Sequence, residues 1–329
     1  MTPSTSVPAD FSSACRLVAA ADTVVAVGHV RPDADAVGSV CAMVRGLSQL
    51  GKRCAGVIGQ DEALGDHLLT IPGAAEVACG ATLPGADLYV VVDCASLERT
   101  GAFAAELELR REKVVVIDHH ESNPGFGAVD VIVPEAESTT VLVEQLLYSL
   151  PGVELDRELA HCLYAGLMTD TGSFRWGGPR MHEAAGRWLG FELDPRRIAG
   201  ELVDSVSSAD LRMIGAVLDS ACRYECWPGV LLVLTAPRRL IGGHPRQAVE
   251  VLIDLVAGTR DADVAAVLKE VGPACWSVSL RSATLNVAEI AARLGGGGHR
   301  AAAGVTLTGT REDVVVALQK EIGHCRQNL

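Results

Sequence analysis

The chain has 329 residues, of which 49% are hydrophobic and 21% are charged. This balance excludes a disordered protein, because a disordered chain combines low hydrophobicity with a high fraction of charge, and the length suggests two domains. The formal net charge of −13 argues against a broad basic face that coats long nucleic acid, but it leaves room for a short phosphorylated ligand in a local pocket.

Short Val-rich runs alternate with helical patterns through the first half of the chain. We expect strands at residues 23–30, 53–59, 87–93 and 113–118, and helices at 36–50 and 102–110. From Ser138 onward the pattern becomes helical, with one helix through residues 141–150 and a second from Asp156 towards Met168. Nearly continuous apolar strands that alternate with helices are typical of a mostly parallel sheet covered on both faces.

A polar segment without a strong strand pattern follows residue 190 and predicts a linker over residues 191–209. This linker would join a larger domain, residues 1–190, to a smaller domain, residues 210–329. In the smaller domain we expect strands at 229–236, 264–271 and 274–282, and helices at 246–257, 286–294 and 311–322. The predicted fold class is therefore α/β in both domains.

The ten cysteines are scattered and include no CxxC pair. Cys222 and Cys226 come nearest to one, and we expect them to share a helix face. The first ten residues lack the basic start of a secretory signal, and no apolar run approaches the roughly 18 residues of a membrane span. We therefore expect reduced thiols in a cytoplasmic protein that has no membrane partner.

Acidic and histidine side chains follow three of the predicted strands and one of the predicted helices. These side chains are His29, Asp33 and Asp35 after the first strand, Asp93 after the third, Asp118, His119 and His120 at the end of the fourth, and Asp170 after the Asp156 helix. In an open parallel sheet the ligand site lies beyond the carboxyl ends of the strands. We therefore expect these groups to meet at one edge.

Four of these carboxylates would be packed together: Asp33, Asp35, Asp93 and Asp170. They cannot all stay ionised unless cations balance their charge. Mixed His and Asp ligands without Cys suit Mn²⁺, Mg²⁺ or Co²⁺ and do not resemble a structural zinc site. A carboxylate shared between two such metals would hold them roughly 3.5–4 Å apart, the spacing of two-metal phosphoryl chemistry. Taken singly, Asp33 is more often a turn residue and Asp93 a helix cap. Their common placement at strand ends favours a metal site.

A second signal is GGGGHRAAAG at residues 295–304. A glycine run lets backbone N–H groups approach a phosphate or a sugar closely, and His299 and Arg300 could add charge and hydrogen bonds. Arg281, at the end of a predicted strand, is a further candidate for binding an anion. In the alternative interpretation the glycines end a helix in a flexible loop, and Arg281 is an ordinary surface charge.

Five motifs resemble a known family. GHVRPDADAVGS, VVVDCAS, VIDHHES and LMTDTGSF resemble the four successive motifs of the DHH phosphoesterases, and GGGGHRAAAG resembles the signature of the associated DHHA1 domain. The resemblance covers nearly the whole chain. The compact length and the ending are similar to the bacterial group of nanoRNases, pAp phosphatases and stand-alone cyclic di-AMP phosphodiesterases. RecJ exonucleases carry additional domains, and family II pyrophosphatases end in a different second domain.

The resemblance implies a two-metal phosphodiesterase or phosphatase that acts on short nucleotides: cyclic di-AMP, pApA, short RNA or pAp. Its two divalent ions would most simply be Mn²⁺, with Mg²⁺ or Co²⁺ possible, and would supply hydroxide at neutral pH. The resemblance implies that the metal ligands are His29 and Asp33 for one ion, Asp35, His119 and Asp170 for the other, and Asp93 as the bridge. It also implies a homodimer.

The resemblance further implies roles for the remaining site residues. Asp118 would orient a histidine, and His120 would lie beside the scissile phosphate as a donor to its oxygen or to the leaving group. The active site would lie in the cleft between the domains. The groups that would grip the other end of the substrate from the smaller domain are Gly296, Gly297, Gly298, His299, Arg300 and Arg281. Arg31 receives no role.

Three alternatives stay open at this point. A RecJ-like single-strand exonuclease or a pyrophosphatase is opposed by the length, the acidity and the GGGGHRAAAG ending. A nucleotide-binding sensor, in which the metal site only anchors a ligand, is opposed by the complete ligand set. An α/β protein with a solvated acidic edge would bind no divalent ion tightly.

Overall fold

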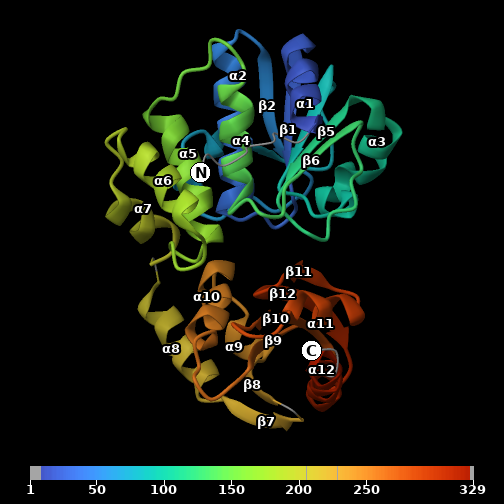
Figure 1. Cartoon of the computed structure of the whole chain (residues 1–329). Coiled ribbons are helices and arrows are strands. Elements are labelled where there is room, and N and C mark those ends of the chain that lie inside the picture. Colours follow the sequence, from blue (N-terminus) through green and yellow to red (C-terminus); the bar gives the residue numbers. More distant parts are fainter. Residues whose placement is uncertain (1–8, 205, 228, 327–329) are drawn as a thin grey trace, which may run out of the picture. The chain divides into compact units, whose positions relative to one another are not determined.

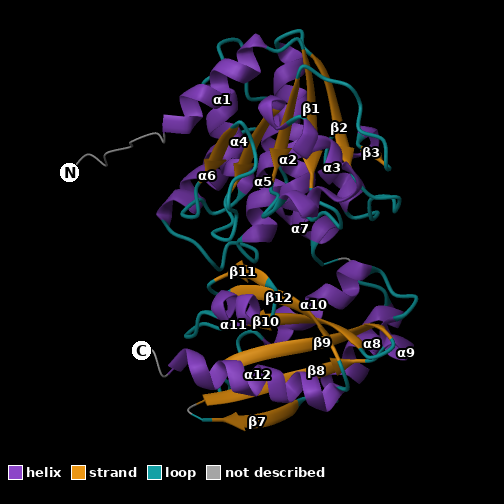
Figure 2. Ribbon diagram, turned by 90° about the vertical axis from the view of Figure 1, so that its right-hand side faces the viewer, coloured by secondary structure: helices purple, strands orange, loops and turns teal. Residues whose placement is uncertain are grey.

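The computed structural model describes residues 9–204, 206–227 and 229–326. The chain forms two compact units, Met1–Ser205 and Val206–Leu329, each with its own sheet and helices (Figures 1 and 2). The predicted α/β class is confirmed in both units. None of the helices in the described part of the chain combines the length and the apolar character that a bilayer span requires.

The first unit is built on a parallel sheet of six strands. These strands are β1 (Thr23–Gly28), β2 (Arg53–Ile58), β3 (Ala78–Cys79), β4 (Leu88–Val92), β5 (Val114–Asp118) and β6 (Val129–Ile132). Their order is β3-β2-β1-β4-β5-β6, and every neighbouring pair is parallel. β4 and β5 are buried at every position, because helices cover both faces of the sheet there.

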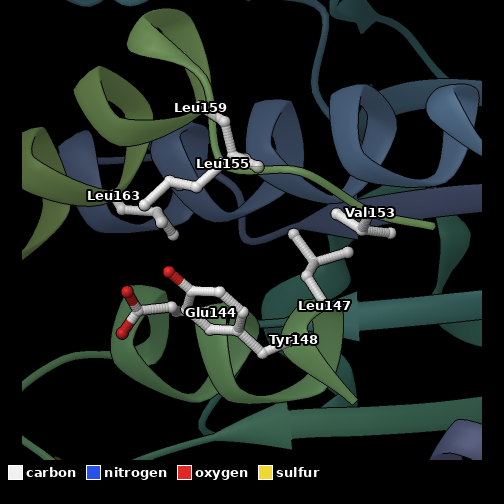
Figure 3. A pocket seen from close by; sticks show the side chains of 7 residues that line it. All are labelled: Glu144, Leu147, Tyr148, Val153, Leu155, Leu159 and Leu163. Atoms are coloured by element: carbon white, nitrogen blue, oxygen red, sulfur yellow. The ribbon is translucent and has the colours of Figure 1, made fainter. Parts of the chain in front are cut away.

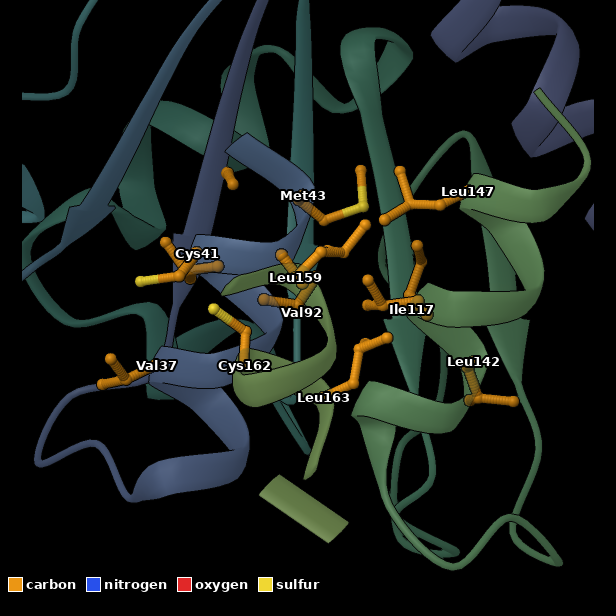
Figure 4. Close-up of a cluster of buried hydrophobic side chains, with 14 of the residues drawn as sticks. Val37, Cys41, Met43, Val92, Ile117, Leu142, Leu147, Leu159, Cys162 and Leu163 are labelled. Carbon is orange, nitrogen blue, oxygen red and sulfur yellow. The ribbon is translucent and has the colours of Figure 1, made fainter. Parts of the chain in front are cut away.

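Seven α-helices surround this sheet. They are α1 (Ala9–Ala20), α2 (Ala34–Gln49), α3 (Ala104–Leu109), α4 (Thr139–Tyr148), α5 (Arg157–Asp170), α6 (Pro179–Leu189) and α7 (Pro195–Leu202). Four short 3₁₀ helices are η1 (Leu68–Thr70), η2 (Ala74–Glu76), η3 (Leu97–Phe103) and η4 (Arg111–Lys113). Figure 4 shows the core in which Met43 of α2, Val92 of β4 and Leu163 of α5 meet.

Some elements of the first unit differ from their predicted form. The first two residues of the helix predicted at 102–110 belong to the 3₁₀ helix η3, in which Gly101 is non-helical with φ 65°, and α3 starts at Ala104. The edge strands β3 and β6 were not predicted. Within the segment expected to be a linker, residues 195–202 form α7, whose Ile198 and Leu202 are buried against the core of the first unit.

The second unit contains a mixed sheet in the order β11-β12-β10-β9-β8-β7. The strands are β7 (Cys222–Cys226), β8 (Gly229–Ala236), β9 (Val264–Gly272), β10 (Cys275–Arg281), β11 (Gly297–His299) and β12 (Ala302–Thr308). Its helices are α8 (Ser208–Leu218), α9 (Arg238–Ile241), α10 (Arg246–Val256), α11 (Val287–Arg293) and α12 (Arg311–Arg326). Helices α8 and α10 pack on one face of this sheet, and α11 and α12 on the other.

One expectation for the second unit was wrong. Cys222 and Cys226 lie on the strand β7, in which polar and apolar residues alternate in burial, and they do not share a helix face. In the glycine run, Gly297 and Gly298 belong with His299 to β11, which pairs antiparallel with β12. None of the nine described cysteines forms a disulfide.

Helices α2 and α5 pack at unusually short range in the first unit. A Cβ atom added at Gly38 of α2 would lie 2.5 Å from the backbone oxygen of Cys162 in α5. Real Cβ atoms do not approach a carbonyl oxygen this closely, so the glycine permits the contact. Asp33 is the N-cap of α2 and Asp170 is the last residue of α5, so two predicted ligands lie at ends of these closely packed helices.

We expect Gly38→Ala to lower the free energy of unfolding by about 1–3 kcal/mol, because the added methyl forces α2 and α5 apart. Gly186 of α6 is the matched control, since a Cβ atom there would meet nothing within 4 Å. Gly186→Ala should leave stability unchanged or raise it by up to about 1 kcal/mol. Urea unfolding of both variants checks this, and equal stability of the two would contradict the close packing.

Candidate metal centre

The carboxyl ends of three neighbouring strands bring together three of the predicted ligands. β4 pairs with β1 on one side and with β5 on the other. His29 follows β1, Asp93 follows β4 and His119 follows β5. All three side chains are buried. The edge at which a parallel sheet binds its ligands therefore carries a compact His–Asp–His group.

Two further carboxylates reach this group from helix ends. Asp33 is the N-cap of α2: its Oδ1 accepts hydrogen bonds from two N–H groups of the first turn, and its Oδ2 lies 3.6 Å from His29 Nε2. Asp170 is the last residue of α5, and its Oδ2 lies 2.9 Å from His119 Nε2. The cap thus fixes one oxygen of Asp33 and leaves the other directed at the site.

Asp35 is completely buried and is held at the N-terminus of α4. Its two oxygens accept hydrogen bonds from the N–H groups of Thr139, at 2.7 Å, and Thr140, at 3.0 Å. The N-terminus of a helix carries unpaired N–H groups and a partial positive charge, which stabilise an anion. This contact fixes the carboxylate of Asp35, whose Oδ2 lies 4.0 Å from His119 Nε2.

Asp93 lies at the centre of the cluster. Its Oδ2 is 3.4 Å from His29 Nε2, and its Oδ1 is 3.7 Å from His119 Nε2. Two atoms that each bind one metal at about 2.1 Å are themselves roughly 3–4 Å apart. His29, Asp33 and Asp93 therefore form one group with the spacing of metal ligands, and Asp35, Asp93 and His119 form a second. Asp93 belongs to both groups.

Both histidines present Nε2 to the cluster and turn Nδ1 away from it. His119 Nδ1 lies 3.1 Å from the backbone oxygen of Ala136, and His29 Nδ1 lies 3.0 Å from that of Val30. A ligating histidine typically donates its second ring N–H to such an oxygen, which directs the lone pair of the other nitrogen at the metal. An Arg99 guanidinium nitrogen also lies 2.8 Å from His29 Nδ1.

The cluster carries more negative charge than its surroundings can balance. Burial raises the pKa of Asp35 well above its usual value, and Asp170 and Asp93 raise it further. Burial also raises the pKa of Asp93. Burial opposes a charge on His29, but contacts with Asp33 and Asp93 outweigh it and raise the pKa of His29 to about 10. The carboxylates therefore hold positive charge in place on the histidine.

Divalent cations would balance the carboxylate charge in place of the protonated histidine, and the side chains of the cluster are suitable ligands for them. The cluster offers carboxylate oxygens and imidazole nitrogens and no thiolate, which suits Mn²⁺, Mg²⁺ or Co²⁺. A cation shared by buried carboxylates removes their mutual repulsion and lets all of them ionise. The chemistry of the described residues thus agrees with a site for divalent metal.

Asp118 has a different environment from the other carboxylates. Its Oδ1 accepts a hydrogen bond from the N–H of His119 at 2.9 Å and lies 2.8 Å from His120 Nδ1. Its Oδ2 accepts a hydrogen bond from Asn123 Nδ2 at 2.7 Å, and the same Asn123 nitrogen donates to the Cys94 backbone oxygen. Asp118 is therefore occupied in fixing the ring of His120, whose side chain is 22% exposed at the site.

Three residues with contacts to this cluster were missed by the sequence reasoning. Asn123 supports Asp118, Thr139 donates its hydroxyl to Asp93 Oδ1 at 3.0 Å, and Arg99 reaches His29. Thr139 is the first residue of α4, at the start of the helical pattern predicted from Ser138 onward. Arg99 contacts His29, and Asn123 contacts Cys94, across long stretches of sequence that no local pattern relates.

A small apolar pocket lies elsewhere in the first unit. Figure 3 shows the residues that line it: Glu144, Leu147, Tyr148, Val153, Leu155, Leu159 and Leu163. The Glu144 carboxylate is used structurally, since it accepts hydrogen bonds from Trp188 Nε1 and from Arg187. Thr139 and Asp170 lie at the opposite ends of α4 and α5 from Tyr148 and Leu159. The pocket is therefore separate from the metal-ligand cluster.

Comparisons with known proteins point in the same direction. Residues 23–167 match the model of the DHH family, N-terminal domain, and residues 240–325 match that of the DHHA1 domain. Over 311 residues the chain is 30% identical to the bifunctional oligoribonuclease and PAP phosphatase NrnA of Thermus thermophilus. This match covers 89% of this chain and 88% of that protein. The chain belongs to the DHH family.

Other proteins share parts of this DHH chain. It is 26% identical over 298 residues to the cyclic-di-AMP phosphodiesterase GdpP of Geobacillus thermodenitrificans, a match that covers 86% of this chain and 44% of that protein. An exopolyphosphatase-related protein from Bacteroides fragilis has the same fold, with a TM-score of 0.84, 23% identity and 96% of each chain covered. The predicted DHH and DHHA1 domains are confirmed, and with them the assignment to the phosphoesterases.

The predicted anion-binding residues of the DHHA1 domain gather at one side of its sheet. Arg281 of β10 pairs with Ala302 of β12, which in turn pairs with His299 of β11, and Arg300 follows His299. The glycines have a structural reason as well: a Cβ atom at Gly296 would lie 2.2 Å from the Gly304 backbone oxygen. Gly297 and Gly298 are part of β11, and Gly298 has φ 139°. Here the hairpin itself requires small residues.

We expect Asp93→Asn to have opposite effects with and without metal. In EDTA the variant should be more stable than the wild type by about 0.5–2 kcal/mol, because it removes a buried charge whose raised pKa marks it as unfavourable. At a Mn²⁺ concentration of 100 times its Kd the wild type should gain about 2.7 kcal/mol, whereas the variant should gain little. Asp61→Asn, at an exposed loop residue, is the control, and unfolding curves under both conditions decide.

Proposed function

We propose that this DHH protein is a two-metal phosphodiesterase that hydrolyses short nucleotides to mononucleotides. Its substrates would be cyclic di-AMP, pApA and other short oligoribonucleotides, and pAp would yield AMP. One observation carries the two-metal centre: buried Asp93 presents one oxygen to His29 and the other to His119. The substrate class is supported by the similarity to an oligoribonuclease and PAP phosphatase and to a cyclic-di-AMP phosphodiesterase.

The metal ligands in this proposal are the residues of the cluster. His29 and Asp33 would hold one ion, Asp35, His119 and Asp170 would hold the other, and Asp93 would bind both. When bound, two such ions, which we propose to be Mn²⁺, supply hydroxide at neutral pH and stabilise charge on a phosphoryl group. The hydrogen bonds from α4 to Asp35 and the capping bonds to Asp33 hold these ligands in position before any metal arrives.

His120 is the residue that we assign to the reacting phosphate. Asp118 holds the Nδ1 side of the ring and so fixes its orientation. In this proposal Nε2 donates to a phosphate oxygen or to the leaving oxygen. Asn123 fixes Asp118 in turn. On the DHHA1 domain we assign substrate contacts to Arg281, His299, Arg300 and the backbone of Gly296, Gly297 and Gly298. These contacts would bind the part of the nucleotide that does not react.

The first test is turnover by the purified full chain with Mn²⁺. We expect AMP from pApA, cyclic di-AMP and pAp, and little cleavage of a long RNA, because the net charge of −13 disfavours a long polyanion. Asp93→Asn is the inactive control. Rapid cleavage of the long RNA would instead support an exonuclease. Binding of metal and nucleotide without any product would support a nucleotide sensor.

The adjacent histidines offer a second test with a built-in comparison. We expect His119→Gln to lose bound Mn²⁺ and activity together, because Nε2 of His119 lies among the ligands. His120→Gln should keep the metal content of the wild type and lower kcat by about 10²–10⁴-fold, because it removes a donor to the reacting group. Metal analysis after dialysis and steady-state kinetics on pApA separate the two roles. Equal metal loss in both variants would contradict them.

A further inference from the structure

The segment that follows Asp170 has an unusual backbone. Gly172, Ser173 and Phe174 all adopt the left-handed conformation, with φ between 57° and 63°. Two of these three residues carry side chains, for which this conformation is unfavourable. Strained backbone of this kind is retained where the surrounding contacts enforce it, and it is concentrated at ligand sites. The strain at residues 172–174 therefore points to a turn that positions side chains for a ligand.

Specific contacts fold this turn back onto the end of α5. The N–H groups of Arg175 and Trp176 both donate to the Thr171 backbone oxygen at 2.9 Å, and the N–H of Ser173 donates to Met168 at 2.7 Å. Thr171 is the residue next to Asp170. The backbone of Trp176 is thus tied to the neighbour of Asp170, which is a residue of the proposed metal centre.

The two aromatic side chains of the turn have different surroundings. Phe174 is half-buried, and its ring centroid lies 5.3 Å from that of Tyr164 in α5. Trp176 is 38% exposed. The indole lies against the backbone of Gly172, where a Cβ atom would come within 3.1 Å of the ring. Phe174 therefore anchors the turn in the core, and Gly172 permits the indole to lie flat against it.

Arg175 places its guanidinium over the indole ring. Its guanidinium carbon lies 5.7 Å from the Trp176 ring centroid, and its Nε donates to the Gly172 backbone oxygen. Nucleobases stack on aromatic rings and on guanidinium planes, and the positive charge of the guanidinium also attracts phosphate. Other exposed aromatics lie elsewhere: Trp227 is in the second unit, and Tyr148 is at the far end of α4.

We propose that Trp176 is the stacking platform for the nucleobase of the nucleotide whose phosphate is held at the metal-ligand cluster. This proposal rests on the proposed function, because it takes a short nucleotide as the substrate. It adds a base-recognition site within the DHH domain itself. The turn ties the backbone of Trp176 to the residue next to Asp170, and stacking tolerates any of the four bases.

The test is binding of AMP to the full chain with Mn²⁺, compared with ribose 5-phosphate, which lacks the base. We expect AMP to quench tryptophan fluorescence saturably and ribose 5-phosphate to leave it unchanged. Trp176→Leu should abolish most of the quenching and weaken AMP binding, measured by calorimetry, roughly 5- to 100-fold, the range that stacking on one aromatic ring implies. Trp176→Phe should retain most of the affinity, because a phenyl ring still stacks.

Trp227→Leu is the matched control, since Trp227 is 92% exposed in the second unit and should affect neither signal. AMP binding by Trp176→Leu within twofold of the wild type would overturn the proposal, and so would a wild type that binds AMP no better than ribose 5-phosphate. Neither readout requires turnover. A wild type that binds AMP through Trp176 but releases no product would sink the phosphodiesterase assignment and leave the stacking site standing.

Discussion

Asp35 and Asp93 are removed from water and held close to each other, so each is stable as an anion only where positive groups or hydrogen-bond donors surround it. The first unit provides such partners from several elements. The N-terminal N–H groups of α4 face Asp35, the hydroxyl of Thr139 faces Asp93, and His29 and His119 lie on either side of Asp93. In the proposed metal centre, divalent cations would balance the negative charge of these carboxylates as well.

The same requirement explains the local architecture. Ligands at the carboxyl ends of β1, β4 and β5 are held at the spacing of neighbouring strands, and Asp93 itself adopts a left-handed φ of 57° immediately after β4. The strain of Asp93 is tolerated because its N–H bonds to the Ile117 backbone oxygen at the adjacent strand end. The sheet and the close packing of α2 on α5 thus provide rigidity that the carboxylates, left to repel one another, would not have.

The parts of the fold that were predicted are those in which one local pattern is sufficient. The Val-rich runs at β4 and β5 are buried on both faces and could hardly be anything but central strands, so the Asp and His residues that follow them were placed correctly at one edge. β3 has only two residues and is too short for any periodicity, and α7 was hidden because its apolar face consists of little more than Ile198 and Leu202.

Other features were missed because they depend on distant segments. In GGGGHRAAAG a flexible loop was the alternative interpretation of the glycines, yet six residues of the motif lie in the paired strands β11 and β12. Arg99 gains its importance only from the distant His29, which the fold brings to it. Asn123 gains its importance from joining nearby Asp118 to Cys94, which follows β4. The proposed ligands could be chosen from their residue types, whereas the groups that orient them could not, because almost any polar residue can do so.

A pair of metals attracts any phosphate, so selectivity for a nucleotide has to come from groups around them. The acidic surface acts first, since repulsion grows with each added phosphate and favours short substrates over long ones. Recognition of the base then requires an apolar or aromatic surface at a fixed distance from the reacting phosphate. Aromatic residues are only 4% of this chain, and a strained turn holds one of them at the surface beside Asp170. In our proposals, selection by length is thus a property of the whole surface, and selection by chemical class a property of one turn.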